Sequence, residues 1–372
     1  MKKVLASVFA LALLLLVAPV ANAASVSITV SEPSHREIDG AFIDDELTAL
    51  LSYGGRLGQL VFNPPRGSRT WFIDPQLIEE VTAMTSEYVL VGGEKGVGED
   101  VAKNWLNQLT AITRGEQINA LPFGSPSAYW ISKLSPTKSE FYLSYGAKRL
   151  TALLNRQVNQ LPDYPKTTYP KLNNSTITAY KKAQQVLALN SAYMTEVEVE
   201  KFQGQSASVL HPRLESNTRT ILTLDLLSSS YALSQKIRLA PGRFTVTSTK
   251  QKLPITLVND FPNPAKISIR VETLNGKVLV GSVPDQVVSG KSKVQAMIPV
   301  EVVTSGQSTL VVKIYSEKNK QLGNPKFYPV TLKVISPIAT WVTTGGAIVL
   351  FISALIQSFR RIKKKRERVA DE

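Results

Sequence analysis

Hydrophobic and polar residues alternate in the part of the chain that precedes its final apolar run. Residues 266–272 read KISIRVE, in which every second residue is apolar, as expected for a strand with one buried and one solvated face. Residues 310–314 and 330–334 repeat this alternation, turn signals lie between such runs, and Asn275-Gly276 is typical of a two-residue hairpin. About seven or eight strands in roughly 100 residues predict an all-β, immunoglobulin-like (Ig-like) sandwich over residues 236–336.

Residues 24–235 carry a different pattern, in which short apolar runs alternate with helix-period segments. The strand-like runs are residues 70–73, 88–91 and 117–121, and the helix-period segments are residues 42–52, 76–84 and 99–112. This alternation predicts an α/β domain with a largely parallel sheet. After residue 135 the helical pattern dominates, in residues 140–158 and 176–201. We therefore expect a partial or degenerate β/α barrel-like domain with added helices.

The chain begins with the features of a secretory signal peptide in residues 1–23. Lys2 and Lys3 precede an apolar run over residues 4–20, and Ala21-Asn22-Ala23 matches the small-residue pattern that a signal peptidase accepts. Export of the chain would place the two predicted domains outside the cytoplasm.

A second long apolar run lies near the carboxyl end. No charged residue occurs between Lys333 and Arg360, and a helix over residues 337–359 is long enough to span a hydrocarbon core about 30 Å thick. The basic tail, residues 360–372, would stay in the cytoplasm by the positive-inside rule and attract anionic lipid head groups there. The sequence thus predicts a single-pass type I protein of the cell membrane, and a basic cluster in this position gives no reason to expect a nucleic-acid partner.

Composition restricts the chemistry further. The 372 residues include no cysteine, which excludes disulfides, thiolate metal sites and cysteine nucleophiles. The two histidines, His35 and His211, lie in loop-like stretches that indicate neither a catalytic triad nor a metal site. The formal net charge is +14. Lys2 and Lys3 contribute +2 of this and residues 360–372 contribute +4, so the predicted ectodomain keeps a mild excess of +8, which suits a surface that meets anionic wall polymers or lipids. We expect no metal and no cofactor.

Asp74 has two interpretations. It follows the strand-like run TWFI and precedes Pro75, and an aspartate at the carboxyl end of a strand is where β/α-barrel enzymes often place a catalytic acid. Aspartate before proline is also a favoured start of a helix, because the carboxylate accepts hydrogen bonds from amides of the first turn. A catalytic acid needs a second carboxylate or a ligand nearby. Capping is therefore the favoured interpretation, with Asp74 kept as a catalytic candidate.

Two further segments complete the candidate site. The loop LPFGSPS offers Phe123, Ser125 and Ser127, and a serine before proline, as at Ser125, is more typical of a helix cap than of a nucleophile. The stretch GGEKGVGED includes Gly96 and Gly98. Glu99 and Asp100 stand where a phosphate loop needs its lysine and hydroxyl, so we expect a flexible turn there. A ligand cleft is expected at the carboxyl ends of the strands. Its candidate residues are Asp74, Gly96, Gly98, Phe123, Ser125 and Ser127.

These segments resemble a family of uncharacterised actinobacterial membrane-anchored envelope proteins. The resemblance rests on the order of the predicted parts and on TWFIDPQLIEE at 70–80, VAKNWLNQL at 101–109, LPFGSPS at 121–127 and KLPITLVNDFPNPAKISIRVE at 252–272. It implies a signal peptide, a degenerate β/α barrel-like domain, an Ig-like domain and a C-terminal transmembrane helix. It also implies genes that often lie near the lipid II flippase, and hence a cell-wall setting.

The resemblance implies no known reaction. The β/α part of the family is similar in outline to glycoside hydrolase or polysaccharide deacetylase barrels, but its loop carries acids where Ser125 and Ser127 stand here. Any chemistry that those acids perform elsewhere in the family would be lost in this chain.

The sequence favours a non-catalytic binding or scaffolding component linked to cell-wall assembly. Its expected partners are cell-wall polymer or membrane-bound wall-assembly proteins. The alternative is a carbohydrate-active hydrolase or deacetylase acting on cell-wall polymer. The enzyme requires Asp74 in an open pocket within reach of another acid, whereas the binding protein allows Asp74 to turn onto the amides of the first helical turn.

Overall fold

The structure is a computed structural model that describes residues 25–165, 171–333 and 337–369. The chain divides into two compact units. The first comprises Met1–Ala188 and Glu196–Tyr231, and the second comprises Leu189–Thr195 and Ala232–Glu372. The predicted signal peptide, residues 1–23, lies outside the described residues.

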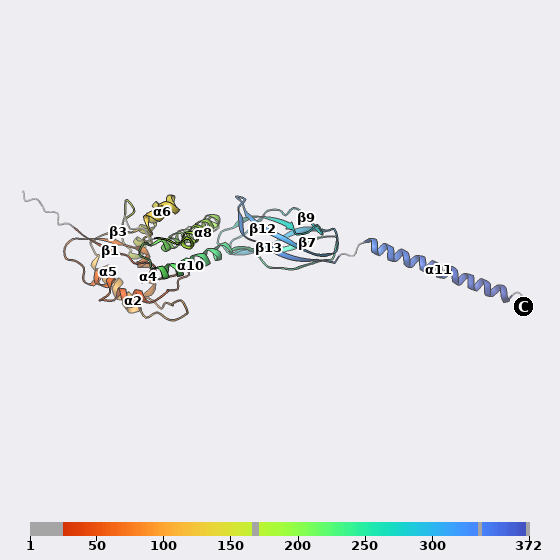
Figure 1. The fold of residues 1–372 in the computed structure, drawn as a ribbon, viewed down its shortest axis with the longest axis horizontal. Coiled ribbons are helices and arrows are strands. Elements are labelled where there is room, and N and C mark those ends of the chain that lie inside the picture. Colours follow the sequence, from red (N-terminus) through yellow and green to blue (C-terminus); the bar gives the residue numbers. More distant parts are fainter. Residues whose placement is uncertain (1–24, 166–170, 334–336, 370–372) are drawn as a thin grey trace, which may run out of the picture. The chain divides into compact units, whose positions relative to one another are not determined.

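The first unit is a mixed α/β domain built on a parallel sheet (Figure 1). Its strands are β1 (Val26–Val30), β2 (Arg69–Ile73), β3 (Gln117–Ala120) and β4 (Asn159–Gln160). They are neighbours in chain order, and each pair is parallel. Four strands in this order form an open arc of a β/α barrel rather than a closed one, in agreement with the expected partial barrel.

Nine α-helices are described in or beginning in this unit. They are α2 (Glu46–Leu51), α3 (Arg56–Phe62), α4 (Pro75–Met84), α5 (Glu99–Ile112), α6 (Ala128–Leu134), α7 (Ser139–Leu154), α8 (Asn174–Asn190), α9 (Glu196–Ser206) and α10 (Ser216–Ser234). In the view of Figure 1, α2, α4 and α5 lie below the labelled strands β1 and β3. The second half of the unit is thus helical, as the sequence pattern indicates.

The two faces of the sheet have different surroundings, because alternate strand residues point to opposite sides. Ile28 and Val30 of β1 and Trp71 and Ile73 of β2 belong to one buried core cluster with apolar residues of α2, α3, α4, α5 and α7. The residues between them in sequence point to the other face, and there they line a cavity described below.

Two predictions for the first unit are wrong in detail, and one strand was missed. Residues 88–91 form isolated bridges with Phe42 and Lys95 rather than a strand of the sheet. Strand β1 was not predicted. The single helix expected over residues 176–201 is two helices, α8 and α9, separated by a 3-10 turn at Ser191–Tyr193.

The second unit is a sandwich of two sheets, as predicted. Its strands are β5 (Ile237–Leu239), β6 (Phe244–Val246), β7 (Lys250–Asn259), β8 (Ala265–Thr273), β9 (Val278–Val280), β10 (Gln286–Val288), β11 (Ser292–Val302), β12 (Gly306–Ser316) and β13 (Gln321–Leu332). One sheet has the order β10-β8-β12-β13-β6 and the other β5-β7-β11-β9. The predicted hairpin at Asn275-Gly276 is wrong, because this turn leads from β8 in one sheet to β9 in the other.

The second unit also includes a short segment from far upstream, Leu189–Thr195. The ring of Tyr193 packs against Phe261, with 6.0 Å between the ring centroids. The backbone amide of Asn263 donates to the carbonyl of Tyr193 at 3.2 Å, and its side-chain amide donates to the carbonyl of Met194 at 2.9 Å. The predicted boundary between residues 235 and 236 did not anticipate this segment.

A long helix, α11 (Pro337–Val369), occupies the carboxyl end of the chain. The sequence predicted a transmembrane helix over residues 337–359 followed by a separate tail, but α11 continues from the apolar run into the basic cluster. Within the described part of the chain, no helix combines the length and the apolar character needed to cross a membrane. The transmembrane prediction is therefore not confirmed.

Candidate functional site

A cavity of about 670 Å³ lies on the face of the sheet opposite the core cluster. Ser27 and Thr29 of β1 and Phe72 of β2 line it, together with residues 161–165 after β4 and residues 211–213 before α10. Its size is within the range of about 300–1,000 Å³ that is usual for small-molecule sites. It is therefore a candidate ligand site of the first unit.

Asp74 lies directly beneath this cavity and is fully buried. As the cap of α4 it accepts a hydrogen bond from the amide of Gln76 at 2.9 Å, which confirms the capping interpretation. Its carboxylate also accepts from the amide of Gly124 at 3.0 Å and from the hydroxyl of Ser125 at 2.6 Å. Asp74 is therefore held by three donors and is not a free acid in an open pocket.

The pKa of Asp74 is nevertheless raised to about 7. Burial is the main cause, because a carboxylate loses hydration in the interior, and the charge of Glu80 adds to the effect. The hydrogen bonds from Ser125, Gln76 and Gly124 act in the opposite direction. The carboxyl group is thus close to its titration point at neutral pH.

Ser125 lines the cavity and is hydrogen-bonded to Asp74 beneath it. Its φ of +41° is unusual for a residue with a side chain, and it places the hydroxyl over Asp74. The prediction that Ser125 caps a helix is wrong, because α6 begins at Ala128 and its cap residue is Ser127. The side chain of Ser127 makes no capping bond, and its buried hydroxyl has no partner among the described residues.

The structure brings four of the six predicted site residues together. Asp74, Ser125 and Ser127 lie at the cavity floor or beside it, and the buried Phe123 donates its amide to the carbonyl of Tyr142 behind them. These residues come from the carboxyl ends of β2 and β3, where the cleft was expected.

Gly96 and Gly98 lie elsewhere. A Cβ on Gly96 would come within 1.9 Å of the Tyr88 ring, and one on Gly98 within 2.0 Å of the Thr48 hydroxyl. A Cβ on Gly98 would also meet Met84, the last residue of α4. Because Asp74 caps the other end of that ten-residue helix, the two sites are about 15 Å apart along it. The glycines permit close packing around Tyr88 and are not part of the cavity.

Arg213 brings a positive charge to the cavity, and Asp163 is the one carboxylate in its described lining. Arg213 donates to the carbonyl of Ser31 at 2.6 Å, and Arg56 donates to the same carbonyl at 3.0 Å while pairing with Glu32. His211, beside Arg213, is buried. Burial and the charges of Arg213 and Arg219 lower the pKa of His211 to about 3, so its imidazole is neutral at physiological pH.

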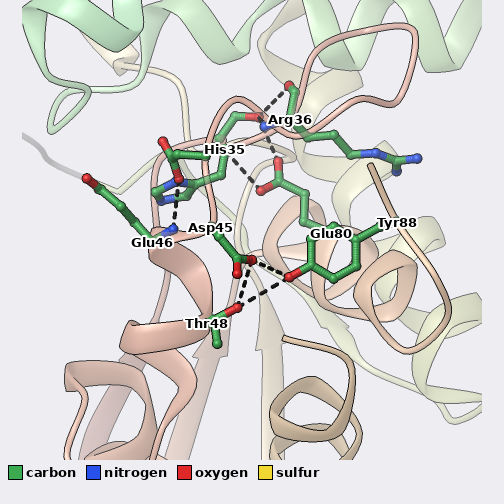
Figure 2. A network of polar contacts seen from close by, with 9 residues as sticks. His35, Arg36, Asp45, Glu46, Thr48, Glu80 and Tyr88 are labelled. Carbon is green, nitrogen blue, oxygen red and sulfur yellow. Dashed lines mark hydrogen bonds and ion pairs between the residues drawn. The ribbon is translucent and has the colours of Figure 1, made fainter. Parts of the chain in front are cut away.

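A second polar network surrounds the other histidine (Figure 2). Nδ1 of His35 contacts a carboxylate oxygen of Asp44 at 2.8 Å. The buried carboxylate of Glu80 accepts from the amide of His35 at 3.1 Å and from the hydroxyl of Ser34 at 2.7 Å. Arg36 is directed away from the imidazole in Figure 2 and donates to a nearby backbone carbonyl.

This environment raises the pKa of His35. Burial alone would lower it, but the hydrogen bond to Asp44 and the charges of Glu80, Asp44 and Glu46 outweigh that effect. Potential ligand atoms of His35, Asp44 and Glu46 all lie within 4.8 Å of one another, so these residues could hold a metal ion. The sequence predicted no metal site and did not indicate that these three residues lie together.

Residues 139–372, more than half of the chain, match a family described as a family of unknown function (DUF6049). The chain belongs to this family. The match supports the resemblance to an uncharacterised family and says nothing of its source organism or gene neighbours. Since the function of DUF6049 is unknown, membership identifies no reaction. A search of curated proteins finds no match.

Solved structures that match part of the chain are distant in sequence. WR4, a C. elegans MSP family member, is 13% identical and has a TM-score of 0.20. The match covers 26% of this chain and 97% of the WR4 chain. PapD-like domain 7 of human CEP192 is 9% identical and covers 27% and 87%, with a TM-score of 0.22. E. coli alpha-2-macroglobulin is 15% identical, with a TM-score of 0.21. The match covers 26% of this chain and 6% of the alpha-2-macroglobulin chain. Similarity at this level carries no functional argument.

Sequence reasoning missed several residues of the site. Glu80 lies on the apolar face of α4 among Leu77, Val81 and Met84, and a carboxylate at such a position indicates a buried polar partner. Arg219 in α10 is buried, with 7% of its surface exposed, and nothing in the surrounding sequence marks it.

Proposed function

We propose that this chain is a non-catalytic binding component of the cell envelope, which holds a unit of cell-wall polymer in the cavity beside β1 and β2. The observation that carries the proposal is the closed floor of the cavity. Ser125 covers Asp74 and donates to it, so a ligand would meet the serine rather than the buried acid. A large cavity with mostly apolar walls and a few polar groups is what a binding site requires.

The alternative of a hydrolase or deacetylase is less well supported. Hydrolysis of a glycosidic bond needs two carboxyl groups that reach the same bond. Of the described residues that line the cavity, Asp163 alone carries a carboxylate. His211 is the single imidazole among them, and its environment opposes protonation. We therefore favour binding over catalysis.

The cellular location is part of the same proposal and rests on the sequence. The signal-peptide pattern, the apolar run that ends at Phe359 and the basic residues after it support a type I anchored protein with both units outside the cytoplasm. Because the chain has no cysteine, a single Ser289→Cys change would allow labelling by an impermeant maleimide. Labelling only after the cells are broken open would contradict this location.

Binding can be tested by retention of the full chain on purified peptidoglycan. Thr29 is an exposed residue of β1 that lines the cavity, so Thr29→Trp would fill the cavity at a position where strands accept aromatic residues. We expect this variant to lose most of its retention. Thr110→Trp, on an exposed face of α5, is the matched control and should bind as the wild type does. Equal retention of all three proteins would overturn the proposal.

A further inference from the structure

The two sides of the cavity differ in charge, which the binding of a neutral sugar would not require. Its walls near the sheet are apolar or carry hydroxyls, whereas residues 211–213 bring positive charge to one side. Arg213 and Arg56 donate to the same carbonyl, of Ser31, so their guanidinium groups lie close together. Glu32 pairs with Arg56, but no ion pair of Arg213 occurs among the described residues. The Arg213 charge is therefore available to a ligand.

His211 adds a neutral donor beside this charge. Its Nδ1 accepts a hydrogen bond from the amide of Arg213 at 3.1 Å, which requires the proton of the neutral ring to be on Nε2. In the described part of the chain, no group forms a hydrogen bond with Nε2, and this atom is not fully buried. His211 is only 2% exposed, but it lines the cavity. Because Nδ1 is occupied by the Arg213 amide, the Nε2–H group is the polar part of the ring that can meet a ligand.

Arg219 fixes the loop that carries both groups. Its buried guanidinium donates to the carbonyls of Val209 at 2.5 Å, His211 at 3.1 Å and Leu214 at 2.8 Å. A charged side chain used to hold three backbone carbonyls makes a rigid loop, and it also adds positive potential at His211. The donors are thus held in place before any ligand binds, which lowers the entropic cost of binding.

Ser125 contributes the opposite polarity on the cavity floor. Its hydroxyl hydrogen is directed to Asp74, and the Ser31 hydroxyl donates to its oxygen at 3.5 Å, so one oxygen lone pair remains for a ligand hydroxyl. Phe72, which is partly exposed, offers an apolar surface in the same cavity. The site therefore combines a hydroxyl acceptor, an apolar wall and an anion-binding end.

We propose that the cavity binds a saccharide unit that bears an anionic group, a carboxylate or a phosphate. Arg213 and the Nε2–H group of His211 bind the anion, Phe72 packs against the sugar, and Ser125 accepts from a sugar hydroxyl. This inference rests on the proposed function, because it specifies the ligand of the same cavity.

The test compares three sugars of similar size with the full chain: glucuronate, glucose 6-phosphate and neutral glucose. Binding is followed through the NMR signals of the His211 ring, which are simple to assign because the chain has only two histidines. We expect one or both anionic sugars to bind at least about tenfold more tightly than glucose, since hydrogen bonds to charged groups are the stronger ones. The relative affinities of the two distinguish a carboxylate from a phosphate.

Two variants locate the anion. Arg213→Gln should reduce the affinity for the anionic sugar about tenfold or more and leave that for glucose unchanged. Arg114→Gln, at an exposed position in the turn after α5, is the control and should have no effect. Equal binding of the three sugars, no binding of any, or an unchanged affinity in Arg213→Gln would overturn the inference.

The outcome is distinguishable from failure of the proposed function. If peptidoglycan retention depends on Thr29 but the anionic and neutral sugars bind alike, the cavity binds wall polymer without selecting an anion. If the anionic sugars bind through Arg213 but peptidoglycan is not retained, the anion site stands and the wall-polymer function is wrong.

Discussion

The two histidines of the first unit lie in opposite electrostatic environments. His35 is surrounded by the carboxylates of Asp44, Glu46 and Glu80, and its pKa is raised against the effect of burial. His211 lies beside the guanidinium groups of Arg213 and Arg219, which lower its pKa together with burial. Both side chains are nearly inaccessible to solvent. The same residue type at similar burial thus has a raised pKa in one place and a lowered pKa in the other.

This difference shows that the surrounding charges, rather than burial, decide what each histidine can bind. The His35 network suits a proton or a metal cation, because its negative groups outnumber the imidazole. The His211 region suits an anion. One domain therefore contains two polar sites of opposite preference, and only the second adjoins the large cavity.

The largest expected effect comes from removing the arginine that holds His211. Arg219→Met leaves the carbonyls of Val209 and Leu214 without their side-chain donor, at about 1–3 kcal/mol each. We expect the free energy of unfolding to fall by about 2–5 kcal/mol in urea titrations. Arg114→Met should change it by less than about 0.5 kcal/mol. Similar losses in both variants would show that Arg219 does not fix the loop.

The pH dependence of stability separates the two histidines by sign. His211 has a folded pKa of about 3, below its unfolded value, so the unfolded chain binds the extra proton and stability falls as the pH drops from about 6.5 toward 3. His35 has a raised folded pKa, so its contribution is present below about 6.5 and is lost as the pH rises through the folded value.

Urea titrations across this pH range should therefore respond oppositely to two variants. His211→Gln should reduce the acid-side slope by up to about 1.4 kcal/mol per pH unit, and His35→Gln should reduce the loss of stability above about pH 6.5. Asp74 also titrates near neutral pH, but both variants retain it, so its contribution cancels in their comparison. The same change of slope in both variants would contradict the opposite environments.

The smallest effect is a selective change in one histidine. Asp44→Asn replaces the charged acceptor of the hydrogen bond that is the largest cause raising the pKa of His35, so this pKa should fall while that of His211 stays constant. Proton NMR titration follows both rings in one spectrum. Asp39→Asn, in the exposed turn before Phe42, is the control and should leave both unchanged. A shift of His211 in Asp44→Asn would show that the two networks are coupled.

Local features of the fold were predictable from the sequence. The start of α4 at Asp74-Pro75 and the alternation in β8 are set by neighbouring residues, and the structure contains both. Strand β1 has a similar signal, because Val26, Ile28 and Val30 make every second residue apolar. Its polar residues face the cavity, so the alternation alone would have indicated a polar or liganded inner face.

The candidate site was predictable only in part. Asp74 and Ser125 come from adjacent strand ends, and the general rule for parallel sheets predicts that they meet. The contact between Arg213 and Ser31 joins residues separated by 182 positions. No local pattern specifies such a contact, because it depends on how the helical second half folds back over the sheet. The position of the Arg213 charge beside the cavity was therefore not predictable from the sequence.

The upstream segment that completes the sandwich has a practical consequence for dissecting this protein. A fragment cut at residue 236 would lack Tyr193, leaving the Phe261 ring without its aromatic neighbour and two hydrogen bonds of Asn263 unmade. Such a fragment would expose the apolar surface around Phe261 and would tend to aggregate. This aggregation would not reflect the behaviour of the intact protein. A peptide spanning residues 189–195, supplied in trans or grafted onto the fragment's amino end, should restore its solubility.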